Sequence, residues 1–581
     1  MNAFRRRAVA EMRTEHPSTT LTPIMRKLVT DSVSMLGRGP DDARTRAAAA
    51  REYAVDHLEE LHEEVRVNFG RRGIGYHVAA TPAEAVGIVR RLLGEAKRVA
   101  KSKTMVGEEV GLTHALRAAG IDVLETDIGE YIVDVEGRGP SHITAPAIHL
   151  NRTRIRELLA RGGAHFPDDD PERLSRYVRD VVGEYFKDCD AAITGANLVI
   201  ASSGRVGIVE NEGNVSLGVS HPRLHISITG YEKVIADEAG ALAVFEVLAP
   251  SATAQPLTSF THFLADPAPG QQRHVVFVDN GRSRIRKDAR YRDVLKCIRC
   301  AACMNCCPVY RVAGGLSYGS PYMGPIGAVL SPLLWRDGRY ADLPFASSLC
   351  GSCTEVCPVG IPLHGMLLDL RGDAVQDGRV DAIERAGWKA WALAFGGATR
   401  ARASSALARI VLHSAGRAVR PTGTREDPRL LPEPRSGRDT AHLRPAAPPP
   451  AVSAAPLPVD TPPAGLVDLF RQRAGELGVT VTDSAPAEPG IVLEAAGAIA
   501  STGSVLLTGD RAARRPLLAA ERVIVRVRPE TIVRYPSDIV PFLGDGEALL
   551  LTGASRTADI EKQIVRGIHG AEQLVVVLTD A

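Results

Sequence analysis

The stretch CIRCAACMNCCP, from Cys297 to Pro308, holds five of the nine cysteines of this 581-residue chain. Four of them follow the order Cys-x2-Cys-x2-Cys-x3-Cys-Pro, the spacing with which bacterial ferredoxins bind a [4Fe–4S] cluster. The two-residue gaps let three thiolates wrap one compact cluster from a tight loop. The fourth cysteine reaches the other cluster of a two-cluster module, so the motif predicts a second set of cysteines.

The second set begins at Cys350 and has the order Cys-x2-Cys-x3-Cys-Pro. Because the last cysteine of each motif crosses to the other cluster, two ligand sets are predicted. The predicted ligands of cluster one are Cys297, Cys300, Cys303 and Cys357. The predicted ligands of cluster two are Cys307, Cys350 and Cys353. Two CxxC units can also bind zinc, but a zinc site does not explain seven cysteines or two Cys-Pro endings.

Cluster two is one ligand short. A full motif would carry another cysteine three residues before Cys350, where the chain has Ser347. The open alternatives are the Ser347 oxygen, the extra thiol Cys306, a water or substrate molecule, or a three-iron cluster. Adjacent side chains tend to point apart in regular structure, and this argues against Cys306, the neighbour of Cys307. We therefore predict two [4Fe–4S] clusters, the second with a non-cysteine fourth ligand or reduced to [3Fe–4S].

Composition sets the remaining limits. The net charge of +2 gives no electrostatic reason to expect a nucleic-acid partner. No apolar run reaches the ~18–20 residues of a transmembrane segment, and the Arg-rich start lacks the apolar core of a signal peptide. We expect a cytoplasmic protein. Cys189, far from both motifs and beside an apolar run, is expected to be a buried core thiol.

The order of helical and strand-like patterns predicts an α/β protein with a helical ferredoxin-type region. Residues 121–135 are predicted to be a strand. The expected regions are an N-terminal helical region (1–70), an α/β domain (71–284), the iron–sulfur domain (285–375), a helical extension (376–419), a Pro/Ala-rich linker (420–465) and a truncated α/β domain (466–581).

A short internal repeat links the two α/β parts. IASSGRV at 200–206 recurs as IASTGSV at 499–505, each beside apolar, strand-like residues. A Ser-Gly or Thr-Gly pair between two strands is typical of a hairpin, because glycine tolerates positive φ. The repeat indicates that the last segment is a shortened relative of the first α/β domain, although two unrelated hairpins can also look alike.

No flavin, nicotinamide, P-loop or hydrolase fingerprint is present, so the catalytic residues stay unknown. Several polar residues are candidates for a substrate site, with ordinary structural roles as the alternative. They are His142, His149, Glu108, Glu109, Asn211, Glu212, Gly213 and Asn214. The segment SRTADIEKQIVRG predicts a helix that begins at Ser555, where capping is the expected role of the first residues.

Five ordered segments, at 125–149, 195–214, 297–311, 324–334 and 343–362, resemble the lactate utilisation iron–sulfur proteins, the B component of a three-part bacterial L-lactate oxidation system. The resemblance covers most of residues 50–375. It implies a CoA-transferase or sugar-isomerase-like (LUD) α/β fold, oxidation of L-lactate to pyruvate, and electron transfer through iron–sulfur clusters. This family has seven cluster cysteines, so Cys306 is an addition here.

The segment after residue 465 resembles the end of the C component, which implies a B–C fusion with a truncated C part. The implied partners are a cysteine-rich A component and a separate C component, and the electron acceptor is left open. The chain departs from the family at Ser202-Ser203-Gly204, where an acidic residue usually precedes Thr-Gly. Two other functions are compatible with the motifs: a relay for another hydroxy acid, and a metal-stabilised scaffold without redox turnover.

Overall fold

The computed structural model describes residues 3–14, 17–378, 382–395, 400, 463–484, 486, 489–509 and 514–579. The chain forms two compact units, one of residues 1–370 with 453–581, and one of residues 371–452. Residues 401–462, which include most of the predicted linker, lie outside the described residues. Among the described helices, none has both the length and the apolar composition that a membrane crossing requires.

A six-stranded sheet forms the centre of the first α/β segment. Its neighbouring strands are all parallel. In spatial order they are β1 (Ile74–Ala79), β10 (Gln272–Val278), β7 (Leu224–Gly230), β4 (Ala191–Gly195), β2 (Arg98–Lys101) and β3 (Asp122–Glu125). A parallel sheet needs helical crossovers that cover both faces, and the predicted α/β class is confirmed.

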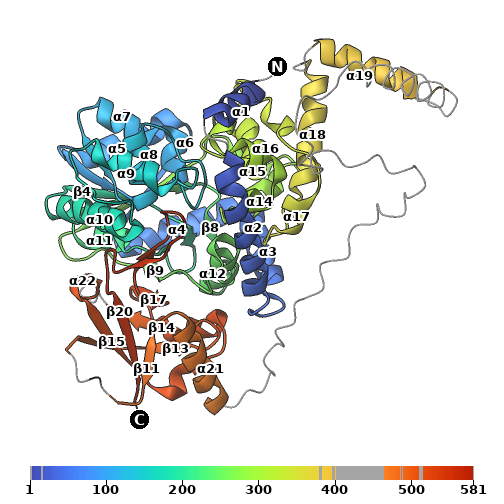
Figure 1. Cartoon of the computed structure of the whole chain (residues 1–581). Coiled ribbons are helices and arrows are strands. Elements are labelled where there is room, and N and C mark those ends of the chain that lie inside the picture. Colours follow the sequence, from blue (N-terminus) through green and yellow to red (C-terminus); the bar gives the residue numbers. More distant parts are fainter. Residues whose placement is uncertain are drawn as a thin grey trace, which may run out of the picture. The chain divides into compact units, whose positions relative to one another are not determined.

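Side chains alternate between the two covered faces of this sheet. In β2, Val99 packs with the first helix group and Ala100 packs with the second. The first group is α5 (Pro82–Leu93), α6 (Met105–Val110) and α7 (Leu112–Ala118), and the second is α8 (Ile128–Glu136), α9 (Arg152–Ala160) and α10 (Pro171–Lys187). Figure 1 shows these helices in blue and teal around the sheet.

The strand predicted for residues 121–135 is wrong beyond Glu125. There β3 ends and α8 begins at Ile128. The Asp127 side chain accepts a hydrogen bond from the Glu130 N–H (3.1 Å) and so caps the helix. Apolar residues at Ile128 and Ile132 have helical spacing and share one buried face.

A second, eight-stranded sheet contains strands from both α/β segments of the chain. In spatial order they are β16 (Ile532–Val533), β13 (Gly497–Ile499), β14 (Ser504–Thr508), β17 (Ala548–Leu551), β9 (Phe260–Leu264), β6 (Arg205–Glu210), β5 (Leu198–Ile200) and β8 (Val234–Ile235). The middle of the sheet is the antiparallel pair β17–β9, where Leu551 lies opposite Phe260. Figure 1 shows the orange and red segment meeting β9 through β17.

The last segment repeats the strand order of the first. Its own parallel sheet is β11 (Thr480–Thr482), β20 (Gln573–Leu578), β15 (Arg522–Val527) and β12 (Ile491–Glu494). This order matches that of β1, β10, β7 and β4 in the six-stranded sheet. The eight-stranded sheet shows the same equivalence: the strand series β16, β13, β14, β17 corresponds to the series β8, β5, β6, β9. Neighbouring strands in the two series have the same parallel or antiparallel relation. Among the described residues, β2 and β3 have no counterpart.

The repeated heptapeptides are the equivalent hairpins of the two halves. IASSGRV joins β5 to β6, and IASTGSV joins β13 to β14. Gly204 and Gly503 have φ of 64° and 65°, a left-handed conformation that glycine adopts without strain. The hairpin prediction is confirmed at both sites.

The cysteine region consists of short helices joined by loops. They are η1 (Arg292–Lys296), α14 (Ala302–Asn305), α15 (Pro308–Ala313), η2 (Leu316–Tyr318), α16 (Gly324–Leu334), η3 (Leu343–Phe345), α17 (Ser352–Glu355) and the start of α18 (Leu363–Gln376). Four N-terminal helices precede the first sheet: α1 (Ala3–Thr14), α2 (Pro17–Leu36), α3 (Ala43–Asp56) and α4 (Leu58–Arg72). In the second unit the described residues form the end of α18 and α19 (Ala382–Phe395).

The N-terminal helices connect the cysteine region to the α/β domain. The fully buried Arg51 of α3 donates to the carbonyl oxygens of Val234 (2.8 Å) and Leu295 (3.0 Å), which belong to β8 and η1. Arg44, also on α3, donates to the carbonyl oxygen of Cys357 (2.8 Å). A buried guanidinium can bind several carbonyl groups at once, so α3 fixes the cysteine loops against the sheet.

Candidate metal centre and cavity

The first cysteine loop turns sharply between η1 and α14. Arg299 and Ala301 both have φ of 63°, which is uncommon for residues other than glycine. The backbone N–H of Arg299 points at the sulfur of Cys297 (3.4 Å). N–H groups directed at a thiolate stabilise its charge, and such bonds are typical of cluster sites. The backbone here is thus shaped around the sulfur atoms.

Similar bonds occur elsewhere in the two motifs. The N–H of Tyr310 points at the sulfur of Cys307 (3.5 Å), and that of Ile361 at the sulfur of Cys357 (3.4 Å). Before Cys353 the chain again adopts left-handed conformations, with φ of 56° at Leu349 and 86° at Gly351. Both cysteine loops therefore combine residues in left-handed conformations with backbone N–H groups that point at sulfur atoms.

The sulfur atoms fall into two sets that cross the motifs. Cys300 interacts electrostatically with Cys357 and Cys297, and Cys353 interacts with Cys307 and Cys350. Cys303 interacts with Cys297 and Cys300, and also with Cys306, which belongs to neither predicted set. Soft thiolates in sets of this kind fit iron–sulfur clusters. The ligand assignment made from the spacing stays a prediction.

The two sets differ in their access to solvent. Cys300, Cys303 and Cys357 of the first set are buried, and Cys297 is half-buried. In the second set Cys350 is exposed. The second set therefore reaches the protein surface, whereas the first lies further inside.

A cavity of about 1290 Å³ adjoins the first cysteine loop. It lies at the carboxyl ends of the parallel strands, where open α/β sheets bind ligands. The residues that follow these strands and line it are Lys103 and Thr104 after β2, Asp127 after β3, Asn197 after β4 and Lys233 after β7. The last segment contributes residues from Arg556 to Ile564, and the cysteine loop contributes Ile298 and Arg299.

The wall beside the cysteine loop is cationic. Arg299 lies with its guanidinium carbon 4.5 Å from the ring centre of Tyr322, and its Nη2 is 3.3 Å from a carboxylate oxygen of Glu232. Its Nη1 is buried without a hydrogen-bond partner among the described residues. Lys233 donates from Nζ to the carbonyl oxygen of Cys297. This wall suits an anionic group such as a carboxylate.

Another part of the cavity lining is acidic. Asp127, Glu212 and Asp559 bring carboxylate oxygens within 4.8 Å of one another. Burial, followed by the charges of Asp127 and Asp559, holds the pKa of Glu212 well above its usual value. Burial likewise lowers the pKa of the nearby Lys562. The three carboxylates can share protons or hold a cation, and Asp559 comes from the last segment.

The two candidate histidines have different positions. His142 lines the cavity, and its Nδ1 accepts from the N–H groups of Thr144 and Ala145 (3.2 Å each). The ring proton therefore lies on Nε2, which donates to Oδ1 of Asn305 (3.0 Å). Burial, with the charge of Lys562, lowers the pKa of His142 to about 3, so the ring is neutral. His149 instead pairs with a glutamate outside the cavity lining.

The other candidates separate in the same way. Asn211, Glu212 and Asn214, three of the predicted candidates, line the cavity. Glu109 is fully buried against Arg282 (2.6 Å), outside the lining, and therefore has a structural role. The remaining candidates do not line the cavity either: Glu108 lies 3.6 Å from Lys101, and Gly213 packs close to the backbone of His569.

Sequence reasoning missed most of the charged residues of the cavity, among them Lys103, Asp127, Lys233, Arg299, Asp559 and Lys562. The first two follow β2 and β3, and a correct end for β3 would have placed them at the carboxyl edge of the sheet. The helix predicted from Ser555 is wrong. That segment forms the pair β18 (Arg556–Thr557) and β19 (Val565–Arg566), with turns between them.

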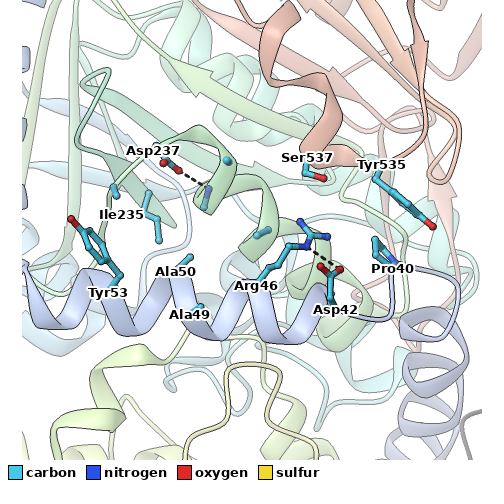
Figure 2. A pocket seen from close by; sticks show the side chains of 14 residues that line it. Pro40, Asp42, Arg46, Ala49, Ala50, Tyr53, Ile235, Asp237, Tyr535 and Ser537 are labelled. Carbon is cyan, nitrogen blue, oxygen red and sulfur yellow. Dashed lines mark hydrogen bonds and ion pairs between the residues drawn. The ribbon is translucent and has the colours of Figure 1, made fainter. Parts of the chain in front are cut away.

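A smaller cavity, of about 880 Å³, lies between α3, the start of α12 (Glu238–Thr253) and η7 (Pro536–Phe542). Figure 2 shows Arg46 turned toward Asp42 (3.0 Å) and Asp237 bonded to the start of α12, where it accepts from the Gly240 N–H (2.8 Å). These groups are occupied by an ion pair and a helix cap, and none of the predicted cluster ligands lines this cavity. We therefore place the candidate site at the larger cavity.

Cys189 is half-buried, and its thiol points at the carbonyl oxygen of Phe186 (3.6 Å). It packs at the edge of the core formed by α8, α9 and α10. It lies apart from both sulfur sets, as predicted, although it is less buried than expected.

Comparison with known proteins agrees with this arrangement. The model of the LUD domain matches residues 62–285 and 489–579, and that of the 4Fe-4S dicluster domain matches residues 293–361. Proteins named lactate utilization protein B from Bacillus thuringiensis (strain Al Hakam), Bacillus cereus (strain B4264) and Bacillus anthracis (strain A0248) are each 42% identical over 352 residues, which is 59% of this chain and 74% of theirs.

A crystal structure of a DUF162 family protein from Deinococcus radiodurans aligns with 38% of this chain and 98% of its own, at 17% identity and a TM-score of 0.22. The family assignment rests on the other matches. The LUD model covers more than half of the chain, in both α/β segments, and the Bacillus proteins align over almost three quarters of their length. The chain therefore belongs to the LUD domain family, with the proteins named lactate utilization protein B among its relatives.

Proposed function

We propose that this chain is the iron–sulfur electron-transfer subunit of a complex that oxidises L-lactate to pyruvate. One observation supports this most directly: Ile298 and Arg299, between the predicted ligands Cys297 and Cys300, line the large cavity. A substrate in that cavity would lie against the loop that holds cluster one. The names of the curated relatives give the substrate.

The proposed reaction removes two electrons and two protons from the C2 hydroxyl carbon of lactate. Two bound [4Fe–4S] clusters would each accept and release one electron. The residues that would hold them are Cys297, Cys300, Cys303 and Cys357 for cluster one, and Cys307, Cys350 and Cys353 for cluster two. The exposed position of Cys350 suits electron exit to another protein.

The charges of the cavity suit a 2-hydroxy acid. Arg299 has a buried Nη1 without a hydrogen-bond partner in the part of the chain that the structure describes, and it can bind the substrate carboxylate. The carboxylates of Asp127, Glu212 and Asp559 lie among the lining residues and can receive protons. A cysteine-rich A component, and a separate C component, are the partners we expect at the surface near Cys350.

The test is lactate-dependent reduction of an artificial acceptor by the reconstituted complex. Cys300→Ser should remove the electron paramagnetic resonance (EPR) signal of cluster one and stop this reduction. Cys189→Ser, a thiol outside both sets, is the matched control and should leave both unchanged. Unchanged electron flow in the Cys300 variant would refute the proposal.

Two further results would replace the proposed function with another one. Faster reduction with glycolate than with lactate would identify another hydroxy acid as the substrate. Zinc without iron in the anaerobically purified chain would favour the scaffold function, in which the metal contributes only folding energy.

A further inference from the structure

The second sulfur set has three members from the cysteine motifs: Cys307, Cys350 and Cys353. A [4Fe–4S] cluster takes four thiolates when it is bound by cysteines alone. The fourth donor must therefore come from another residue, from solvent or from a substrate. The sequence raises two candidate side chains, Ser347 and Cys306. The Ser352 hydroxyl, 3.6 Å from the sulfur of Cys350, is an oxygen donor of the same kind as Ser347.

Ser347 is engaged in its own turn. Its Oγ accepts a hydrogen bond from the backbone N–H of Leu349 (3.1 Å), one residue before Cys350. Serine–backbone bonds of this kind stabilise local turns. A hydroxyl is also a harder donor than a thiolate and must lose a proton with a much higher pKa to bind iron. Both facts make Ser347 the weaker candidate.

Cys306 lies within electrostatic range of all three members of the set. Its sulfur interacts electrostatically with those of Cys307, Cys353 and Cys350. The helix that precedes it, α14, packs directly against α17, which carries Cys353. Cys303 is also near, but the set to which Cys303 belongs already has four cysteines. The neighbourhood of Cys306 is thus that of the incomplete set.

The backbone removes the objection that adjacent side chains point apart. That rule holds in regular structure, whereas Cys306 and Cys307 occupy the junction between α14 and α15. Cys306 has helical dihedral angles (φ −89°, ψ −13°) and Cys307 has extended ones (φ −75°, ψ 119°). A change of conformation between two neighbours lets both sulfur atoms approach the same set.

We propose that Cys306 is the fourth thiolate ligand of the second cluster, so that this chain binds its two clusters with eight cysteines. The inference rests on the proposed presence of two clusters and adds a ligand to the second. It also predicts a [4Fe–4S] cluster there in the protein as isolated, in place of [3Fe–4S]. The structural alternative is a free thiol that donates to the carbonyl oxygen of Cys303, which lies 3.4 Å from the Cys306 sulfur.

The experiment compares the full-length chain with Cys306→Ala, Ser347→Ala and Cys189→Ala, all purified anaerobically. Iron content and EPR spectra are recorded as isolated and after reduction. The wild type should carry about eight iron atoms, two clusters of four. Cys306→Ala should carry about seven, with a three-iron signal as isolated and an unchanged cluster-one signal. The other two variants should match the wild type.

Alkylation followed by mass spectrometry gives a second measurement that needs no variant. Cys306 should be labelled at least about ten-fold more slowly in the iron-loaded chain than after chelation, because a metal-bound thiolate is not a free nucleophile. If Cys306→Ala fails to fold, the labelling of Cys306 in the wild-type chain decides the question. Equal labelling before and after chelation would refute the assignment.

Other outcomes separate this inference from the proposed function. Iron loss in Ser347→Ala, with Cys306→Ala unchanged, would overturn it in favour of the serine oxygen. A wild type without iron would overturn both proposals. Eight iron atoms, seven in Cys306→Ala, and no lactate-dependent reduction would refute the function and leave the ligand assignment intact.

Discussion

Nε2 of His142 donates to Oδ1 of Asn305 over 3.0 Å, and this bond joins the cavity wall to the first cysteine loop. Both residues are buried. Asn305 ends α14, directly before Cys306. A hydrogen bond in the buried interior is costly to break, because the polar group that loses its partner cannot form a hydrogen bond to water instead. His142 therefore positions the loop that carries the sulfur atoms.

His142→Ala should lower the free energy of unfolding of the iron-loaded chain by about 1–3 kcal/mol, because Oδ1 of Asn305 is left buried and unsatisfied. The denaturant midpoint measures this. His114→Ala, at an exposed site, is the control. With a pKa of about 3, His142 should add no inflection to the activity profile between roughly pH 5 and 8. Equal midpoints for wild type and variant would contradict the positioning role.

Arg299→Met should raise the KM for lactate by roughly 10- to 100-fold, because a charge-assisted hydrogen bond to a carboxylate contributes about 1.5–3 kcal/mol. The buried Glu232 keeps its other partner, Arg282 (2.5 Å), so the fold should survive. Steady-state kinetics with iron content measured on the same sample is the assay. Arg311→Met is the matched control, since Arg311 lies beside the second sulfur set and outside the cavity lining. An unchanged KM would place the substrate carboxylate elsewhere.

The sulfur sets and the repeated hairpins could be predicted from the sequence because each depends on a local pattern. Cysteine spacing encodes the loop that a cluster needs. The Gly204 and Gly503 turns are visible because glycine alone accepts their positive φ without strain. In both cases the residues that carry the signal are neighbours along the chain.

The cavity could not be predicted, because its parts meet only in the folded chain. Lys103 and Asp127 come from two strand ends, and Asp559 belongs to a segment more than 400 residues later. The segment after Ser555 has apolar spacing typical of a helix, yet tertiary packing makes it the β18–β19 pair. Local propensity is a weak prior where a segment completes the core of another part of the chain.

Glu246 should make stability depend on pH. Burial raises its pKa to about 7, although Arg46 lies 2.7 Å away. A raised pKa in the folded state means that the stabilising contribution is present below the unfolded pKa of about 4.5 and is lost as pH rises through about 7. The loss is at most about 3.5 kcal/mol, because the pKa rises from 4.5 to about 7 and each pKa unit corresponds to ~1.4 kcal/mol.

Glu246→Gln should remove this dependence, so that the variant gains stability relative to the wild type from roughly pH 5.5 to 8. Denaturant midpoints across that range are the measurement. Glu60→Gln, on an exposed face of α4, should keep the wild-type slope. Parallel curves for wild type and Glu246→Gln would show that this carboxyl group is ionised throughout.

Glu547→Ala tests whether the two α/β halves unfold together. Arg273 of β10 donates from Nη2 to Oε1 of Glu547 (3.0 Å), just before β17, and both side chains are buried. Removal of one partner leaves a buried charge and should cost about 3–5 kcal/mol. Because β17 pairs with β9 in the shared sheet, the whole α/β part should lose stability in one transition. Glu572→Ala, at an exposed site, is the control. Separate unfolding of the last segment, with the first half unaffected, would mean that the shared sheet does not couple the two halves.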